Sequence, residues 1–571
     1  MKKIKDSPFY KSSDFWWLTA ILAVTALVFG YLLSAPRLTW DDDSNIFANP
    51  FYKMGLWQPF WVQSYFGLYV PVTSTVWQIV FTLGGGEVWP FRVLNLLLHA
   101  GCVILVYFML RDLMRRWELD RTAVLIAVTV FALHPLQVHT VAWISGGRDL
   151  LSTFLALSAL AVYFSRNTWN GFALATFLFL LALLAKPAVA VLPAVVVILN
   201  WILHGKPSKK IWAQMAIWGA FSFFVIILTR QAQQAFLDQD ISLFQRGLIM
   251  LDTYSFYLQK FIFPYPLSAN YGRTPQVALA DPGMIWSALL GLGILGGLLL
   301  LAWRTDRRYA LIAVWFIALL PVSGIVNFGF QLISTVSDHY NYMPMAALAA
   351  LIALMLSRID WRRLTRFAEP AILVALIMGL GFMSWQRVHA WEGDAAFFTD
   401  MQRTAPDSYS TAIGMSVVEC DERKNYDDGV RWTEKALKAQ PNDIKALANQ
   451  AYCYLHAKNY FRVMELEYYL DKLDLEELEA SQPTAYSSLL ASIGTAYVEQ
   501  QQYEDGYQFL CEAYRVLPSE PSHARNLQIG ARILQEHGIT PNCESPERYP
   551  EDDAGGAEPP EPVEPVWPPA Q

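Results

Sequence analysis

The chain has 571 residues, of which 54% are hydrophobic and only 16% are charged. Soluble domains carry about a quarter charged residues, so this balance predicts a membrane protein. The net charge of −7 comes partly from an acidic C-terminal tail. No basic stripe with interleaved aromatic residues is present, so we expect no nucleic-acid partner.

Apolar runs extend from about residue 16 to residue 385, whereas the remainder is polar and acidic. The first run, residues 15–33, is long enough to cross a bilayer, which requires roughly 20 apolar residues. Lysines precede it as in a signal peptide, but no small-residue cleavage pattern follows, so we expect an uncleaved span. Later spans are predicted near residues 100, 128, 157, 178, 195, 220, 294, 318, 349 and 376, which gives about eleven crossings.

Four clusters of basic residues orient these spans by the positive-inside rule. They alternate correctly if the N-terminus is cytoplasmic and if residues 246–263, in the outer loop 230–283, form an amphipathic helix at the outer interface. An odd number of crossings then places everything after Trp385 outside the cytoplasm. The clusters are Arg111, Arg115, Arg116 and Arg121; Lys206, Lys209 and Lys210; Arg304, Arg307 and Arg308; and Arg358, Arg362, Arg363 and Arg366.

The polar region shows internal similarity with a period near 34 residues, in which Asn425-Tyr426 recurs as Asn459-Tyr460. Small and aromatic residues at this period are typical of tetratricopeptide repeats, whose helix pairs stack into a solenoid. We therefore predict an all-α chain in three parts. These are a polytopic helical membrane domain (1–390), a tetratricopeptide-like α-solenoid (391–540) and a disordered, acidic, Pro-rich tail (541–571).

The cysteines give no clear pattern. Cys102 lies in a predicted span, and the other four lie in the polar region, where an oxidising compartment would permit disulfides. Cys420 and Cys453 occupy nearly equivalent positions of neighbouring repeats, which argues that they are too far apart to bridge, and free buried thiols are an equal alternative. No His/Cys cluster has metal-ligand spacing, so no metal site is predicted, and the sequence does not decide whether a divalent metal assists.

Three consecutive aspartates follow the first span, in the predicted outer loop 37–88. A carboxylate held near the membrane interface can serve as general base toward an incoming hydroxyl. The structural alternative is a solvated span end or an N-cap for the next helix. The candidates for a catalytic base are Asp41 and Asp42.

Other ionisable residues gather at the predicted outer ends of the spans. Such groups are costly at membrane depth and by default suggest function. Cations there suit a phosphate at headgroup level, whereas snorkelling or pairing with a carboxylate is the structural alternative. Together they describe a site for a lipid-phosphate-linked substrate, whose predicted members are His134, His139, Arg148, Asp149, Lys186, Arg246, Asp338, His339 and Tyr340.

Several short motifs follow one another along the chain: Trp40-Asp41-Asp42-Asp43, Tyr69-Val70-Pro71, RVLNLLLH at residues 92–99, FALHP at residues 131–135, Val141-Ala142-Trp143, Asp149-Leu150-Leu151-Ser152, Lys186-Pro187, DHYNYMP at residues 338–344, and Trp391. This ordered set resembles the transmembrane-and-tetratricopeptide-repeat O-mannosyltransferases and their bacterial relatives. The similarity covers nearly the whole chain up to about Gly538.

The resemblance implies a GT-C glycosyltransferase, a multi-span enzyme that transfers a sugar from a polyprenyl-phosphate carrier to an acceptor at the outer face. An aspartate of the first outer loop would deprotonate a Ser or Thr hydroxyl of the acceptor, and the anomeric configuration would invert. The departing lipid phosphate would be stabilised by nearby cations, for which the candidates are Arg148, Lys186, Arg246 and His339.

The chain departs from this pattern at several positions. Relatives often carry an acidic residue in place of His139, an arginine in place of His339, an arginine in place of Val70 and an aspartate in place of Asn200. The two histidines would retune the phosphate or sugar site or mark a different donor, so the identity of the sugar stays open.

Two other functions stay open: a non-catalytic scaffold whose repeats recruit an envelope assembly, and a polymerase or ligase that uses a lipid-linked glycan. A transporter fits less well, because its charges should lie near the membrane midplane. The short repeat array and the lack of an organelle signal favour a bacterial inner-membrane protein. The expected partners are a lipid-linked sugar donor, membrane lipids and a protein acceptor that the extracytoplasmic repeats engage.

Overall fold

The computed structural model describes residues 9–65, 67–232, 241–361, 367–470 and 472–543. The described part of the chain is helical and contains no strand, only an isolated antiparallel bridge between Tyr65 and Leu68. The all-α prediction is therefore confirmed for these residues. Most of the predicted disordered tail lies outside the described residues, and so do Arg362, Arg363 and Arg366 of the fourth basic cluster.

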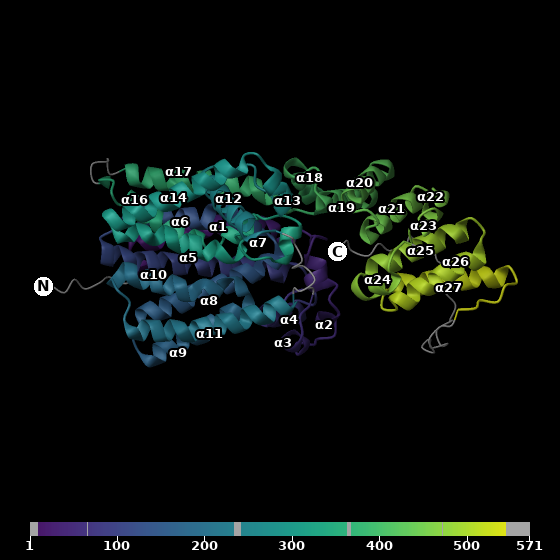
Figure 1. Ribbon diagram of the computed structural model, residues 1–571, viewed down its shortest axis with the longest axis horizontal. Coiled ribbons are helices and arrows are strands. Elements are labelled where there is room, and N and C mark those ends of the chain that lie inside the picture. Colours follow the sequence, from purple (N-terminus) through teal and green to yellow (C-terminus); the bar gives the residue numbers. More distant parts are fainter. Residues whose placement is uncertain (1–8, 66, 233–240, 362–366, 471, 544–571) are drawn as a thin grey trace. The chain divides into compact units, whose positions relative to one another are not determined.

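The chain divides into two compact units, residues 1–404 and 405–571, coloured from purple to green and from green to yellow in Figure 1. The division falls later than the predicted boundary at residue 390, because α18 (Asp394–Thr404) belongs to the first unit. The Thr39 amide donates a 3.0 Å hydrogen bond to the carboxylate of Asp394. Arg387 and Asp400 form a 2.5 Å ion pair.

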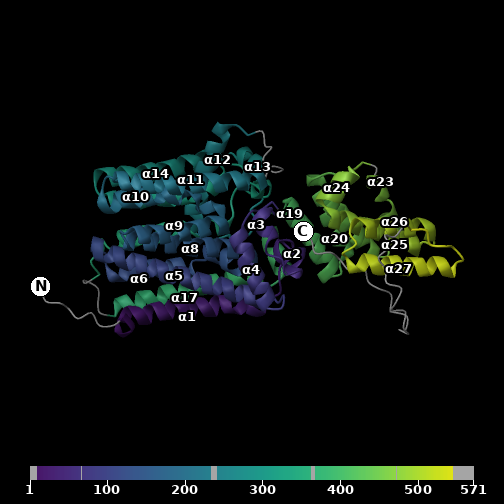
Figure 2. The same cartoon turned by 90° about the horizontal axis from the view of Figure 1, so that it is seen from below.

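The first unit is a bundle of helices with short helices gathered at one end (Figures 1 and 2). In addition to α18, its helices are α1 (Ser13–Gly30), α2 (Pro50–Lys53), α3 (Pro59–Val62), α4 (Pro71–Leu83), α5 (Trp89–Trp117), α6 (Arg121–Leu133), α7 (Leu136–Ala142), α8 (Gly147–Ser165), α9 (Trp169–Ala185), α10 (Leu192–His204), α11 (Lys209–Ala232), α12 (Leu243–Ile262), α13 (Pro275–Ala280), α14 (Met284–Arg304), α15 (Leu311–Leu319), α16 (Met345–Leu356) and α17 (Ala368–Val388).

Seven helical segments among the described residues are long and apolar enough to cross a membrane, and an eighth arises if the bent pair α6 and α7 counts as one span. The seven are Ser13–Ser34, Trp89–Trp117, Ile144–Ser165, Pro187–His204, Lys209–Ala232, Met284–Arg304 and Ala368–Trp391.

Each of the eleven predicted crossings coincides with an apolar helix, but α9, α15 and α16 are short. They have 17, 9 and 12 residues, fewer than the roughly 20 that a bilayer requires. The number of eleven thus stays a prediction. The predicted amphipathic helix near residues 246–263 is found as α12, which is not among the candidate spans.

One end of the bundle is fixed by charges at helix starts. The Asp120 carboxylate accepts hydrogen bonds from the amides of Thr122 (2.7 Å) and Ala123, which caps the first turn of α6. The neighbouring Arg121 pairs with Asp14 of α1 at 2.5 Å and also with Glu369 of α17. The three helices α1, α6 and α17 therefore begin at the same end of the unit.

The second unit consists of helices that pack against their neighbours in the sequence, α19 on α20, α20 on α21, α25 on α26 and α26 on α27. Successive packing of helix pairs is compatible with the predicted solenoid. Its helices are α19 (Tyr409–Val417), α20 (Tyr426–Ala439), α21 (Ile444–His456), α22 (Tyr460–Met464), α23 (Glu467–Leu470), α24 (Leu475–Ser481), α25 (Pro483–Glu499), α26 (Tyr503–Val516) and α27 (Pro521–Glu536).

Two disulfides correct the sequence-based interpretation of the cysteines. Cys420 bonds to Cys453, with Cα atoms 5.5 Å apart, and Cys511 bonds to Cys543. The sequence left disulfides and free thiols equally open, and the separation of equivalent repeat positions counted against this particular bridge. The close approach depends on Gly429 of α20, where a Cβ atom would lie only 1.9 Å from the sulfur of Cys420.

Candidate functional site

Asp41 and Asp42 directly precede a short π-helical turn, Asp43–Phe47, and Asp43 is its first residue. Asp42 is only 1% exposed, and its Oδ1 atom accepts two hydrogen bonds from Ser145, one from the amide (3.0 Å) and one from the hydroxyl (2.8 Å). Asp43 instead pairs with Arg37 at 2.5 Å. Asp41, the other predicted base, is half-buried beside them.

The turn that carries Ser145 is held by polar side chains of α5. Arg92 donates a 3.0 Å hydrogen bond to the carbonyl of Ala142, and Asn95 donates a 2.8 Å bond to the carbonyl of Trp143. At Gly146, a Cβ atom would lie 2.4 Å from the carbonyl oxygen of Thr140, so only glycine fits. These contacts fix Ser145 and, through it, Asp42.

A buried ion pair lies next to this turn. Lys186, at the end of α9, contacts Asp149 in the first turn of α8 at 2.6 Å, and its ammonium lies 5.5 Å from the ring centre of Tyr340. Arg148 donates from Nε to the carbonyl of Ser145 over 3.1 Å. Its guanidinium lies 5.4 Å from the ring of Trp143. Two cations therefore sit close to the residues that hold Asp42.

Two of the predicted site histidines, His139 and His339, are in contact with each other. The rings of His139 and His339 lie 4.7 Å apart, centre to centre, in an edge-to-face arrangement. The ring of Trp143 lies 5.2 Å from His339, and the ring of Trp391 lies 4.8 Å from His139. Ser337 Oγ lies 2.9 Å from His339 Nδ1. One aromatic cluster thus connects the histidines with Trp143 and hence with Arg148.

These contacts bring together seven of the predicted residues, Asp42, His139, Arg148, Asp149, Lys186, His339 and Tyr340. We call this set, with Ser145 and Trp143, the polar cluster. It draws on the loop after α1, on α7, on the start of α8, on the end of α9 and on the 3₁₀ turn Asp338–Asn341. Sequence reasoning missed Ser145, although its position directly before Gly146-Gly147 and Arg148 was a usable signal.

Asp338 faces a neighbouring group of charges. Its Oδ1 accepts a 2.6 Å hydrogen bond from the Tyr271 hydroxyl, and the charges of Arg387 and Lys260 act on it. Lys260 itself donates a 2.7 Å bond to the carbonyl of Pro266. Asp338 therefore joins the polar cluster only through its chain neighbour His339.

His134 and Arg246 have other surroundings. The two ring nitrogens of His134 contact main-chain groups, Nε2 the carbonyl of Phe261 (2.9 Å) and Nδ1 the amide of Leu136 (3.2 Å), which leaves neither for a phosphate. Arg246 hydrogen-bonds Asn327. It lies eleven residues, or about 16 Å, along α12 from Tyr257, whose hydroxyl bonds to Ser337.

A break in the helix path places the polar cluster. Between α6 and α7 the axis bends by 51° at His134-Pro135, because proline has no amide hydrogen and its ring cannot continue the helix. The break frees three carbonyls, and a side chain caps each: Gln137 Nε2 donates to Phe131 O (3.0 Å), His99 Nε2 to Ala132 O (3.0 Å) and Ser384 Oγ to Leu133 O (2.8 Å).

Burial dominates the electrostatics of the loops. It raises the pKa of Asp42 to about 7, against the lowering effect of the Ser145 hydrogen bonds and the Arg92 charge, and Asp41 adds to the rise. Burial also raises the pKa of Asp43 to about 6 and that of Asp338 to about 7.

Burial and nearby charges also shift the pKa values of Tyr340 and His339. Burial raises the pKa of Tyr340 well above the ordinary value, and the charges of Tyr257, Asp149 and Asp41 act in the same direction. Burial lowers the pKa of His339, and the nearby His139, Lys186 and Arg148 reinforce the effect, so this imidazole is neutral near pH 7.

Several buried polar atoms in this region have no hydrogen-bond partner among the described residues. A buried polar atom without a partner is costly, so such a group points to water or a ligand. The atoms are Asp42 Oδ2, His139 Nδ1, Trp143 Nε1, Asp149 Oδ2 and Asp338 Oδ2.

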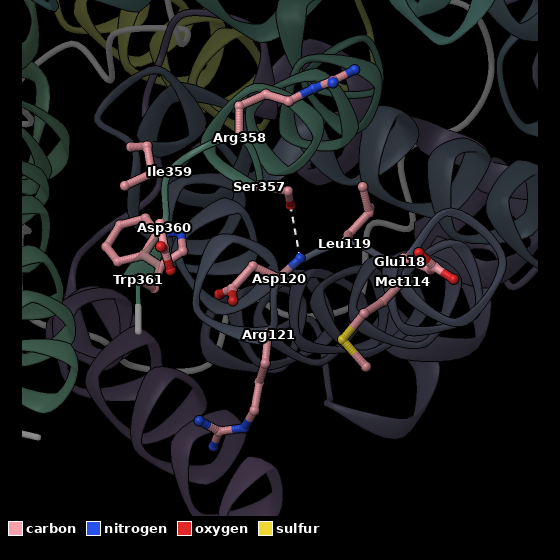
Figure 3. Close-up of a pocket in the computed structure, with 10 residues that line it drawn as sticks. All are labelled: Met114, Glu118, Leu119, Asp120, Arg121, Ser357, Arg358, Ile359, Asp360 and Trp361. Carbon is pink, nitrogen blue, oxygen red and sulfur yellow. Dashed lines mark hydrogen bonds between the residues drawn. The ribbon is translucent and has the colours of Figure 1, made fainter. Parts of the chain in front are cut away.

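An open cavity of about 560 Å³ lies at the other end of the bundle, lined by Asp120, Arg121, Ser357, Asp360 and Trp361 among others (Figure 3). The 13-residue helix α6, about 20 Å long, separates Arg121 from the bend near His134. The cavity is therefore not part of the polar cluster.

Within the described residues, no group of three or more His, Cys, Asp or Glu side chains is arranged to hold a metal ion. No family model, curated protein or solved structure matches the chain. The polar cluster thus has to be interpreted from its own geometry.

Proposed function

We propose that the chain is a membrane glycosyltransferase that transfers a sugar from a polyprenyl-phosphate carrier to a hydroxyl of a protein acceptor. The observation that carries this proposal is the meeting of a buried carboxylate, Asp42, with two cations, Arg148 and Lys186, at one end of an apolar helix bundle. Transfer of a sugar from a phosphate leaving group to a hydroxyl needs both a base for the hydroxyl proton and positive charge for the departing phosphate.

In the proposed reaction, Asp41 or Asp42 accepts the proton of the acceptor hydroxyl. The hydroxyl oxygen attacks the anomeric carbon, the bond from that carbon to the phosphate oxygen breaks, and the lipid phosphate leaves with the bonding electrons. Arg148 and Lys186 stabilise the negative charge of the leaving group. Attack from the face opposite to the leaving group inverts the anomeric configuration.

The unsatisfied polar atoms support this function over a purely structural one. Asp42 Oδ2 and Asp149 Oδ2 can accept hydrogen bonds, and Trp143 Nε1 can donate one. A bound sugar phosphate carries hydroxyl donors and oxygen acceptors that meet both needs. A scaffold has no need of such a group of buried charges at one bundle end.

The proposed topology has eleven crossings, a cytoplasmic N-terminus and an extracytoplasmic repeat domain in a bacterial inner membrane. The two disulfides of the second unit support this orientation, because such bonds persist in oxidising compartments and are rare in the cytosol. We propose that the helix pairs are tetratricopeptide repeats that engage the protein acceptor.

A transfer assay in membranes tests the proposal. Wild type, Asp41→Asn and Asp42→Asn are compared at equal expression, and mass spectrometry of envelope proteins measures the glycan. Asp112→Asn, an exposed change on α5, is the matched control. We expect one of the first two variants to lose the glycan and the control to keep it. If cells that lack the whole chain show an unchanged glycan, the proposal that the chain is a glycosyltransferase is wrong.

The same assay separates two alternatives. If the chain is a polysaccharide polymerase or ligase, the sugar that the variants fail to transfer is missing from a lipid-linked glycan and not from protein. For a membrane-anchored scaffold, both aspartate variants retain function, and deletion of the repeat unit alone abolishes it. The polar cluster favours an enzyme over the scaffold, since a scaffold uses neither a base nor cations at this site.

A further inference from the structure

The loop that follows the first candidate span carries an exposed apolar surface. Residues 54–62 contain five large apolar side chains that face outward, with Trp57 51% exposed and Val62 82% exposed. We call these five residues the apolar rim: Met54, Leu56, Trp57, Trp61 and Val62. No Asp, Glu, Lys or Arg occurs anywhere between residues 54 and 86.

The chain path keeps this loop close to a membrane face. Ser13–Ser34 and Trp89–Trp117 are consecutive long candidate spans, and their helices α1 and α5 pack against each other. The loop between them leaves the bundle and returns to it at the same end, so both of its ends lie at one face of the membrane. Figures 1 and 2 place α2, α3 and α4 together at that end of the first unit.

We propose that the apolar rim inserts into the lipid leaflet at this end of the bundle and anchors the aspartate loop at the membrane surface. The occupant is the boundary between headgroups and acyl chains. Trp and other large apolar side chains without nearby charges are favoured there. The Trp61 indole fits this place, because its Nε1 donates a 3.0 Å hydrogen bond to Thr75 while the ring faces outward.

The inner side of the same segment explains why the rim cannot simply turn inward. Tyr52 and Phe60 are buried, with ring centres 4.8 Å apart, and occupy the core of the loop. This core also contains Ile46 and Phe47, from the turn that carries Asp43, and Ile144, which precedes Ser145. Packed side chains therefore connect the rim to the turn that begins at Asp43, next to Asp42, and to Ser145, which hydrogen-bonds Asp42.

Insertion of the rim would thus set the depth of the aspartate loop relative to the lipid. The inference does not require the chain to be an enzyme. It concerns only the surface that faces the leaflet, and its test reads lipid contact directly.

Nitroxide labelling measures this contact. Cys102 is buried and the other four cysteines form disulfides, so a single introduced cysteine is the reactive thiol. The full chain, with Trp57→Cys or Val62→Cys, is reconstituted in vesicles of phosphatidylethanolamine and phosphatidylglycerol. Collision rates of the label with oxygen, which concentrates in lipid, and with a water-soluble nickel complex are compared.

Two controls define the scale. Leu27→Cys places the label on an exposed position of α1 within a candidate span, and Gln501→Cys places it on an exposed turn of the second unit. We expect the labels at residues 57 and 62 to collide more with oxygen than with nickel, as at residue 27 and opposite to residue 501. Met54→Glu in the Val62→Cys background should reverse the ratio at residue 62.

Two results overturn the proposal. Greater contact with nickel than with oxygen at both rim positions would show that the rim faces water. Protection from both reagents would show that the rim is covered by protein, either a second copy or another segment. The amount of Met54→Glu protein recovered in vesicles shows whether this variant inserts. If it does not, the Trp57→Cys and Val62→Cys chains without the Met54→Glu change still decide the question.

Discussion

Ser145 donates two hydrogen bonds to a single carboxylate oxygen of Asp42, one from its amide and one from its hydroxyl. The second oxygen, Oδ2, has no partner among the described residues. An aspartate that is hydrogen-bonded at one oxygen and lacks a partner at the other has the geometry of an oriented base. Ser145 is therefore a positioning residue in the proposed reaction.

The Ser145 hydroxyl should control the pH dependence of transfer. Its hydrogen bond lowers the pKa of Asp42, so Ser145→Ala should raise that pKa above about 7. Because a base acts when deprotonated, the acid limb of the transfer rate should move to higher pH, while Ser145→Thr should keep it in place. Rates measured from pH 5 to pH 9 test this, and an unmoved limb in Ser145→Ala would exclude the role.

Asp42 should also make the folded chain less stable at high pH. Its pKa is about 7 when folded, against an ordinary value of 3.8, so the folded state binds more protons between these values. Stability should therefore fall as the pH rises from about 4 to about 7. Asp42→Asn should remove this fall, seen as a higher melting temperature at pH 8 than wild type, with Asp112→Asn as control. Equal melting at pH 8 would contradict the burial effect.

Substitutions in the ion pair of Lys186 and Asp149 should affect stability and transfer differently. Removal of one member leaves the other buried and unpaired, so Lys186→Met or Asp149→Leu alone should destabilise the chain by about 3–5 kcal/mol. The double change should restore much of the melting temperature, because no charge is left unpaired. Transfer should stay lost in the double variant, since the cation is absent. Recovery of transfer there would exclude Lys186 from phosphate stabilisation.

The disulfide between Cys420 and Cys453 makes Gly429 essential to the second unit. Gly→Ala inside a helix usually stabilises by up to about 1 kcal/mol. Here the added Cβ would collide with the Cys420 sulfur, so Gly429→Ala should lower the melting temperature of the full chain. Removing the bridge with Cys420→Ser and Cys453→Ser should cost about 2–4 kcal/mol. In that background Gly429→Ala should be less harmful; equal harm would point to another cause.

The contact between His139 and His339 predicts a coupled pair of substitutions. His139→Asp or His339→Arg alone would introduce a buried, unpaired charge and should reduce yield and stability. The two together place opposite charges at neighbouring positions, as the 4.7 Å ring separation allows, and should restore folding. Melting temperatures of the four chains form a double-variant cycle. Additive losses would mean that the two sites do not interact.

The apolar runs predicted much of the fold, because hydropathy depends on local composition alone. Each predicted crossing near residues 128, 178, 318 and 349 contains a helix, but these helices are bent or short. Proline breaks and short helices change length without changing hydropathy, so sequence reasoning could not separate full spans from partial ones.

The sequence predicted most residues of the candidate site but not which of them lie next to one another. The expectation that ionisable residues meet at the outer ends of the spans grouped Arg148, Lys186 and His339 with Arg246. The first three do lie together, whereas Arg246 hydrogen-bonds Asn327. Depth in the membrane is readable from hydropathy, whereas position around the bundle depends on helix packing. Ser145 was missed for the same reason, because its partner Asp42 is 103 residues away in the chain.

The bend at Pro135 changes how polar residues within the apolar helices should be understood. Gln137, His99 and Ser384 each saturate a carbonyl that the break exposes. The side chains of these residues hydrogen-bond the backbone of α6, although the residues themselves belong to α7, α5 and α17. Substituting Pro135 by alanine would therefore not by itself produce a straight helix. The three side-chain donors would still compete with backbone amides for the carbonyls of residues 131–133. The kink is a shared property of three helices, and its removal requires their joint redesign.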